Sequence, residues 1–71
     1  MYMIVNYSAI GKKIKHSRQM HDLTQEDLAF EIDTSPAYIS NIERGKKKPS
    51  LQKLMEITEI LEITINDLLY D

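Results

Sequence analysis

The residues best suited to chemistry lie between positions 35 and 44, where polar side chains recur at helical spacing. Positions 37, 41 and 44 are four and three residues apart, so a helix would place them on one face. Asn suits the N6/N7 edge of adenine, Arg suits the O6/N7 edge of guanine or a phosphate, and Ala can lie against a thymine methyl. A bare helix face without a partner is the alternative. The predicted base-reading residues are Ala37, Ser40, Asn41 and Arg44.

A run of lysines follows this segment directly and is a candidate for phosphate contacts. Each Lys–phosphate contact releases counterions, so affinity should fall with salt at a log–log slope of about −0.9 per neutralised phosphate. A charge run is more often a solvated loop, but its position beside the polar face favours phosphate. The candidates are Lys46, Lys47 and Lys48, with Lys12, Lys13 and Lys15 as weaker ones.

The residues from Thr24 to Gly45, TQEDLAFEIDTSPAYISNIERG, must position this face, and they indicate two short helices joined by a tight turn. Thr24 can cap the first helix, with Asp27 at the capping-box position. Ser35 can cap the second, Pro36 suits its first turn and Gly45 can take a left-handed stop. The apolar residues expected to face inward are Leu28, Ala29, Ile32, Ile39 and Ile42. Ala29 is small enough for the two helices to approach closely. This is the layout of a helix-turn-helix that presents its second helix to a groove.

Three further helices are predicted around this unit. One runs from Tyr7 or Ser8 to about Met20, with Ile10 and Ile14 inward. Another begins after Pro49-Ser50, and its expected inward residues are Leu51, Leu54, Met55, Ile57, Thr58 and Leu61. A last one starts at Thr64, has Asp67 at the capping-box spacing, and turns Ile65, Leu68 and Leu69 inward. The expected fold is a single all-α domain of five helices over residues 1–71, in which residues 1–6 form an apolar leader.

These motifs resemble the Cro and lambda-type repressor helix-turn-helix family, also called the xenobiotic-response-element family. The resemblance rests on T-Q-x-x-L-A, then S-P-x-Y-I-S-x-I-E-R-G, then P-S before a second apolar helix, and it spans roughly Ile10 to Leu69. It implies a lambda-repressor-like fold and binding to double-stranded DNA, with Asn41 the foremost base-reading residue. It also implies that Gln25 contacts the DNA backbone and braces the reader helix, and that Arg18 pairs with Glu43. Without the resemblance, Gln25 would be only a good helix former at an exposed helix start.

Two further features leave alternatives open or depart from the family. The Tyr38 hydroxyl can bond a phosphate, or its ring can pack at the edge of the core. At three turns where the family often has glycine, this chain has Asp22, Asp33 and Glu62. Asp tolerates a left-handed backbone better than most residues, so Glu62 is the least comfortable of the three.

The composition excludes several other classes of site. The chain of 71 residues has no Cys, and its two His cannot complete a metal shell. We expect His16 and His21 to face solvent. No apolar run approaches the roughly 18–20 residues of a membrane span. No catalytic constellation or glycine-rich phosphate loop is present, so we expect a cytoplasmic, nucleoid-associated protein that is not an enzyme and has no cofactor or metal.

The charge is distributed unevenly along the chain. Through Lys53 there are nine basic and six acidic residues, a net of +3, whereas the remainder has five acidic residues and no basic one. The overall net charge of −2 therefore conceals a basic front and an acidic back. Ordinary solvation of a charged surface is the alternative explanation, but one phosphate-facing surface fits better.

We therefore expect a regulator, specifically a repressor, that binds DNA as a homodimer. The expected dimer surface comprises Ile63, Ile65, Leu69 and Tyr70, with a possible contribution from Met1–Val5. The leader could be disordered, pack on the domain or pair with a second subunit; packing or pairing is favoured because exposed apolar side chains are unfavourable in water. The alternative is a protein-interaction module, such as an antitoxin's docking part or an antirepressor partner, that keeps the fold without binding DNA.

Overall fold

The computed structural model describes residues 5–70, and the helices found there confirm the all-α prediction. They are α1 (Tyr7–Met20), α2 (Gln25–Glu31), α3 (Pro36–Glu43), α4 (Leu51–Leu61) and α5 (Ile65–Leu69). No strand occurs within this described range. The predicted leader, Met1–Asn6, lies mostly outside it. Its last residue, Asn6, belongs to the fold instead, because its side chain accepts a hydrogen bond from the Ala9 N–H and caps α1.

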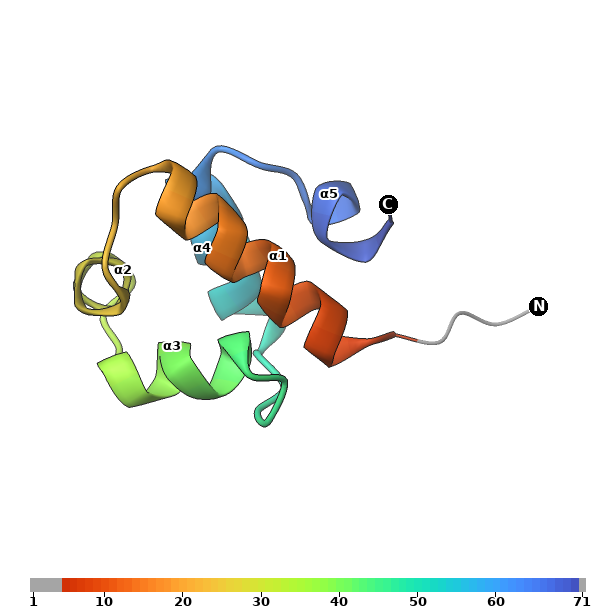
Figure 1. Cartoon of the computed structure of the whole chain (residues 1–71), viewed down its shortest axis with the longest axis horizontal. Helices are drawn as coiled ribbons and strands as arrows, with labels where there is room; N and C mark the ends of the chain where they lie inside the picture. Colours follow the sequence, from red (N-terminus) through yellow and green to blue (C-terminus); the bar gives the residue numbers. More distant parts are fainter. Residues whose placement is uncertain (1–4, 71) are drawn as a thin grey trace.

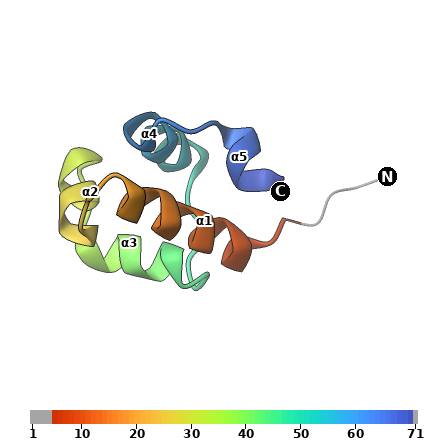
Figure 2. The same cartoon turned by 45° about the horizontal axis from the view of Figure 1, so that its top comes forward.

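Helix α1 lies at the centre of the arrangement (Figure 1). Figure 2 shows α3 along one side of α1, α4 and α5 on the opposite side, and α2 closing the end. Helix α1 packs against α3, α4 and α5, and α2 packs against α3 and α4. Helix α1 therefore lies between α3 and the C-terminal pair, while α2 contacts α4 directly. No helix within residues 5–70 is long and apolar enough to cross a membrane.

Side-chain caps set the start of α2 to α5, as the sequence predicted. Thr24 and Thr64 each form a reciprocal capping box, with Asp27 and Asp67 respectively. Ser35 and Ser50 cap α3 and α4. The Thr24 backbone N–H donates to the Asp27 carboxylate at 2.8 Å. This hydrogen bond, with a second contribution from the Thr24 side chain, lowers the pKa of Asp27 below its ordinary value.

The first four helices all end in the same Schellman turn. A left-handed residue follows the helix, and the next N–H reaches back to a carbonyl of the last turn, as in Ile63 N–H to Thr58 O at 3.0 Å. Only one of the four left-handed residues is a glycine. They are Asp22 (φ 56°), Asp33 (φ 54°), Gly45 (φ 73°) and Glu62 (φ 57°). The three residues that stand where the family often has glycine therefore all adopt the left-handed backbone, including Glu62, the least comfortable of them.

The core is a single cluster with contributions from every helix. Its buried members are Ile10, Ile14, Leu28, Ala29, Ile32, Ile39, Ile42, Ile57, Leu61 and Leu68. Two residues of α4 expected inside are exposed instead: Leu51 (69%) and Met55 (55%). Met55 is one residue past the half-buried Leu54, about 100° around the helix, so it turns away from the core. Leu51 lies in the first turn of α4 and is left open to solvent by the residues that the structure describes.

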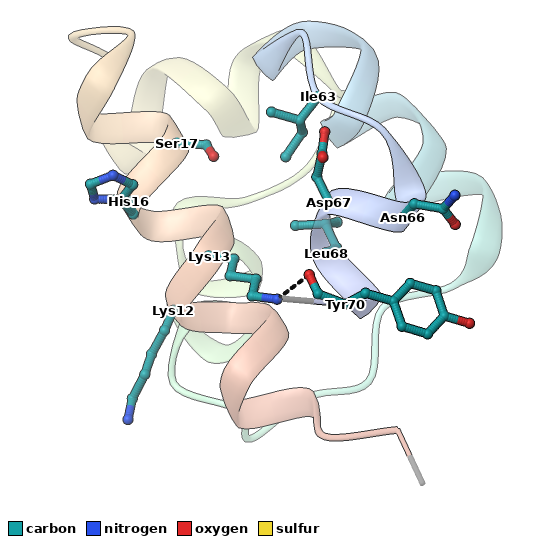
Figure 3. Close-up of a pocket in the computed structure, with 9 residues that line it drawn as sticks. All are labelled: Lys12, Lys13, His16, Ser17, Ile63, Asn66, Asp67, Leu68 and Tyr70. Carbon is teal, nitrogen blue, oxygen red and sulfur yellow. Dashed lines mark hydrogen bonds between the residues drawn. The ribbon is translucent and has the colours of Figure 1, made fainter. Parts of the chain in front are cut away.

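Helix α5 is seated less deeply than the sequence indicated. Leu68 is buried, but the other two residues expected to face inward, Ile65 and Leu69, are only half-buried. A groove of about 730 Å³ opens between α1 and α5, with Lys13 and Ile63 among its lining residues (Figure 3). This side of the molecule is therefore incompletely filled.

Candidate nucleic-acid interface

The outward face of α3 is open over most of its length. Ile39 and Ile42 are completely buried beneath it. Ala37 and Arg44 are exposed, and Ser40 and Asn41 are half-buried. Within residues 5–70, the side chains of Asn41 and Arg44 have no hydrogen-bond or ion-pair partner. An amide and a guanidinium are thus presented on the surface with their donors available.

The turn after α3 brings the lysine run beside this face. Gly45 N–H donates to Ile42 O at 3.0 Å, and Lys46 N–H donates to Asn41 O at 2.8 Å, which fixes the direction in which the chain leaves the helix. Lys46, Lys47 and Lys48 are all exposed. Because Arg44 is exposed immediately before the turn, four cationic side chains gather at the end of α3.

Two tyrosine rings lie under two of these lysines. The Lys47 Nζ lies 5.7 Å from the centroid of the Tyr38 ring. The Lys48 Nζ lies 5.8 Å from the centroid of the Tyr7 ring, which belongs to α1. Both distances are within the range of a cation–π interaction. The Tyr38 ring is half-buried against the core, as one of its two predicted roles requires.

A buried ion pair locks α3 to α1. The Arg18 Nε donates to Glu43 Oε2 at 2.6 Å, and its Nη2 donates to Oε1 at 3.1 Å. The side chains are only 8% and 2% exposed. A third guanidinium nitrogen, Nη1, donates to Leu23 O at 2.7 Å. The ion pair implied by the family resemblance is therefore present, in the bidentate geometry that Arg and carboxylates favour.

Gln25 takes part in the same network. Its Nε2 donates to Glu43 Oε1 at 3.0 Å, so the first residue of α2 is tied to the last residue of α3. This is the bracing expected of Gln25. It also commits one of the two N–H groups of the amide, which leaves the other as the side-chain donor for any phosphate.

Gly11 has a role in this arrangement that was not predicted from the sequence. A Cβ at Gly11 would lie 2.3 Å from Ile42 O and 2.6 Å from Glu43 O, so only glycine lets α1 come this close to α3. The available signal was a glycine in the interior of a helix, which is unfavourable for the helix and commonly has a packing reason. Gly11 thus helps set the depth at which α3 is seated.

Not every lysine lies on the α3 side. The Lys13 Nζ donates to Tyr70 O at 2.8 Å, across the groove between α1 and α5 (Figure 3). The Lys13 side chain is therefore engaged at the groove rather than beside α3, and its predicted phosphate contact stays a prediction. Lys53 donates to Ile32 O and to Glu56 and so ties α4 to the end of α2. The hydrogen bond from Lys53, followed by one from Gln52, lowers the pKa of Glu56.

Comparisons with known proteins agree with this geometry. The helix-turn-helix family pattern matches residues 14–68. The chain is 41% identical over 56 residues to the uncharacterized HTH-type transcriptional regulator MJ0272 of Methanocaldococcus jannaschii, covering 79% of this chain and 85% of the relative. It is 42% identical over 62 residues to the control protein C.MunI of Mycoplasma sp., covering 86% and 84% respectively.

A solved structure with the same architecture is SinR, the master regulator for biofilm formation, in complex with DNA. The two superpose with a TM-score of 0.79 and 31% identity, over 86% of this chain and 98% of SinR. The family match covers the buried network, α3 and the following turn together. The chain therefore belongs to the helix-turn-helix family of transcriptional regulators, of the Cro and lambda-repressor type.

Proposed function

We propose that this protein is a homodimeric repressor that binds an approximately palindromic DNA duplex. The observation that carries the proposal is the open face of α3, where Asn41 and Arg44 have no partner within residues 5–70 while the opposite face is buried. Two such helices would enter successive major grooves about 34 Å apart. We propose further that the protein is cytoplasmic and associated with the nucleoid, where duplex DNA is available to it.

The roles within the face follow from the chemistry of each side chain. Asn41 would bond an adenine edge, and Arg44 a guanine edge or a neighbouring phosphate. Ala37 would contact a thymine methyl, and Ser40 a base edge or the backbone. Phosphates would be held by the remaining donors near the face: Gln25, Tyr38, Lys46, Lys47 and Lys48. SinR, which shares the fold, is itself recorded in complex with DNA.

The proposed dimer uses the α5 side of the molecule. Ile63, Ile65 and Leu69 are half-buried and Tyr70 is 52% exposed, so apolar area there is available to a second subunit. The suggested contribution of Met1–Val5 falls mostly outside the described residues. Because Tyr70 bonds Lys13 through its backbone carbonyl, Tyr70→Asp would keep that bond. It should convert a dimer to a monomer in sedimentation equilibrium without unfolding the chain.

Selection of bound duplexes from a random pool, followed by anisotropy over a salt series, tests the DNA proposal. Asn41→Ala should cost about 1–3 kcal/mol on the selected site and relax preference at one base position. Lys47→Ala should weaken all sequences alike and reduce the salt slope by about 0.9. Glu59→Ala, an exposed change on α4, is the control and should alter neither. If no duplex binds even at low salt, a protein-interaction module becomes the better reading.

A further inference from the structure

The start of α1 lies directly against the lysine loop, although about forty residues separate them in sequence. A Cβ at Gly45 would lie 2.8 Å from the Ser8 Cα, so the turn after α3 touches the first turn of α1. Tyr7, the first residue of α1, stands at this contact with its ring facing the Lys48 ammonium at 5.8 Å. Tyr7 itself is half-buried and packs against the core.

The ring restrains Lys48 without neutralising it. A lysine in a loop samples many rotamers, and ordering it on a ligand has an entropic cost. A carboxylate would order the side chain but cancel its charge, whereas the face of an aromatic ring attracts the ammonium and leaves the charge intact. Within residues 5–70, neither Lys47 nor Lys48 has an acidic partner, and each lies over a tyrosine ring. This combination suits a cation that must meet an anion on the open side.

We propose that Tyr7 is a positioning residue for DNA binding, which holds the Lys48 ammonium beside the reader helix so that it meets a backbone phosphate. The inference rests on the DNA-binding function proposed above. Tyr7 acts through Lys48 and does not touch DNA itself. The Tyr7 ring contacts one side of the Lys48 ammonium, and the N–H groups on the other side can donate to the phosphate. Tyr38 holds Lys47 in the same way, but Tyr38 lies on α3, so its own contacts would confuse a test.

The test compares Tyr7→Leu with Tyr7→Phe in anisotropy on the selected duplex over a salt series. Tyr7→Leu keeps apolar packing but removes the ring, and it should weaken binding about two- to fivefold at low salt. It should also reduce the salt slope by up to about 0.9, the share of one phosphate. Tyr7→Phe should restore affinity to within about twofold of the wild type. In a Lys48→Ala background Tyr7→Leu should have no further effect, because the two residues act as one unit.

A second measurement applies to the wild-type protein without DNA. The Lys48 side-chain Cε protons, lying over the ring, should resonate upfield of those of an unrestrained lysine, and Tyr7→Leu should abolish the shift. If these protons have the same shift as an unrestrained lysine, the proposal is overturned, even if Tyr7→Leu fails to fold. Equal affinity and salt slope for Tyr7→Leu and wild type would also overturn it while leaving the DNA-binding function standing. If the wild type binds no duplex, both proposals fail together.

Discussion

The front of the molecule, formed by α1, α2 and α3, is closely packed. The back, formed by α4 and α5 against α1, is packed less completely. At the front, Glu43 accepts three hydrogen bonds from Arg18 and Gln25, and Gly11 allows backbone-to-backbone contact. At the back, a groove of about 730 Å³ remains between α1 and α5. Exposed apolar side chains occur in both regions, with Met20 and Phe30 at the front and Leu51, Met55 and Tyr70 at the back, so the groove and not the exposed apolar area distinguishes the two.

In the function proposed above, the two regions would have different tasks. A face that reads base edges must keep its geometry to within a fraction of an ångström, so the reader helix needs partners that fix it on several sides. A face that associates with another subunit instead needs apolar area that its own chain leaves uncovered. The charge follows a similar division, because α4 and α5 contain Glu56, Glu59 and Asp67 and only one basic residue, Lys53.

Among variants of the front, Arg18→Met should have the largest effect on stability. It would strand the Glu43 carboxylate in a site where its side chain is 2% exposed, and should lower the free energy of unfolding by about 3–5 kcal/mol. Denaturant unfolding at neutral pH measures this, with the exposed Lys15→Met on the same helix as the control. Adding Glu43→Leu should recover most of the loss. A loss below about 1 kcal/mol would mean that the front is not held by this pair.

The next test concerns the depth of the contact between α1 and α3. Gly11→Ala places a Cβ 2.3 Å from a backbone oxygen that has little freedom to move, so the two helices must separate. We expect a loss of about 1–3 kcal/mol from overpacking, even though alanine is the better helix former. Thermal unfolding measures it, and Ser8→Ala, an exposed change in the same helix, should be close to neutral. A more stable Gly11→Ala protein would show that the contact is looser than described.

The smallest test compares the turns of the two regions. Glu62 at the back is left-handed at φ 57°, and Glu62→Gly should stabilise the protein by up to about 1 kcal/mol. Asp33→Gly, at the front turn between α2 and α3, should gain less because Asp tolerates this backbone better. The Glu62 carboxylate lies 3.6 Å from His21 on the surface, and losing that contact should matter little. The melting temperature should rise more for Glu62→Gly than for Asp33→Gly. A larger rise for Asp33→Gly would contradict the conclusion that Glu62 is the more strained of the two residues.

The predictable part of the structure was local. Helix starts follow from Thr24, Ser35, Ser50 and Thr64 because a cap needs only a side chain and an N–H within three residues. The left-handed turns were predictable for the same reason, from the place of Asp22, Asp33 and Glu62 at the helix ends. Leu51 and Met55 were predicted to face inward but are exposed. Hydrophobic periodicity identifies the apolar face of a helix, but it does not show whether another element covers that face.

Sequence alone thus determined which segments are helices, where they begin and end, and that one polar face recurs at the spacing of a reader helix. Only the tertiary structure decided which groups meet across the chain. In that structure Gln25 donates a hydrogen bond to Glu43, Lys13 donates one to the Tyr70 carbonyl, and the Tyr7 ring lies under the Lys48 ammonium. Caps and turns are fixed by neighbours a few bonds away, whereas these partners are chosen by how closely helices pack, and that depends on all the helices at once.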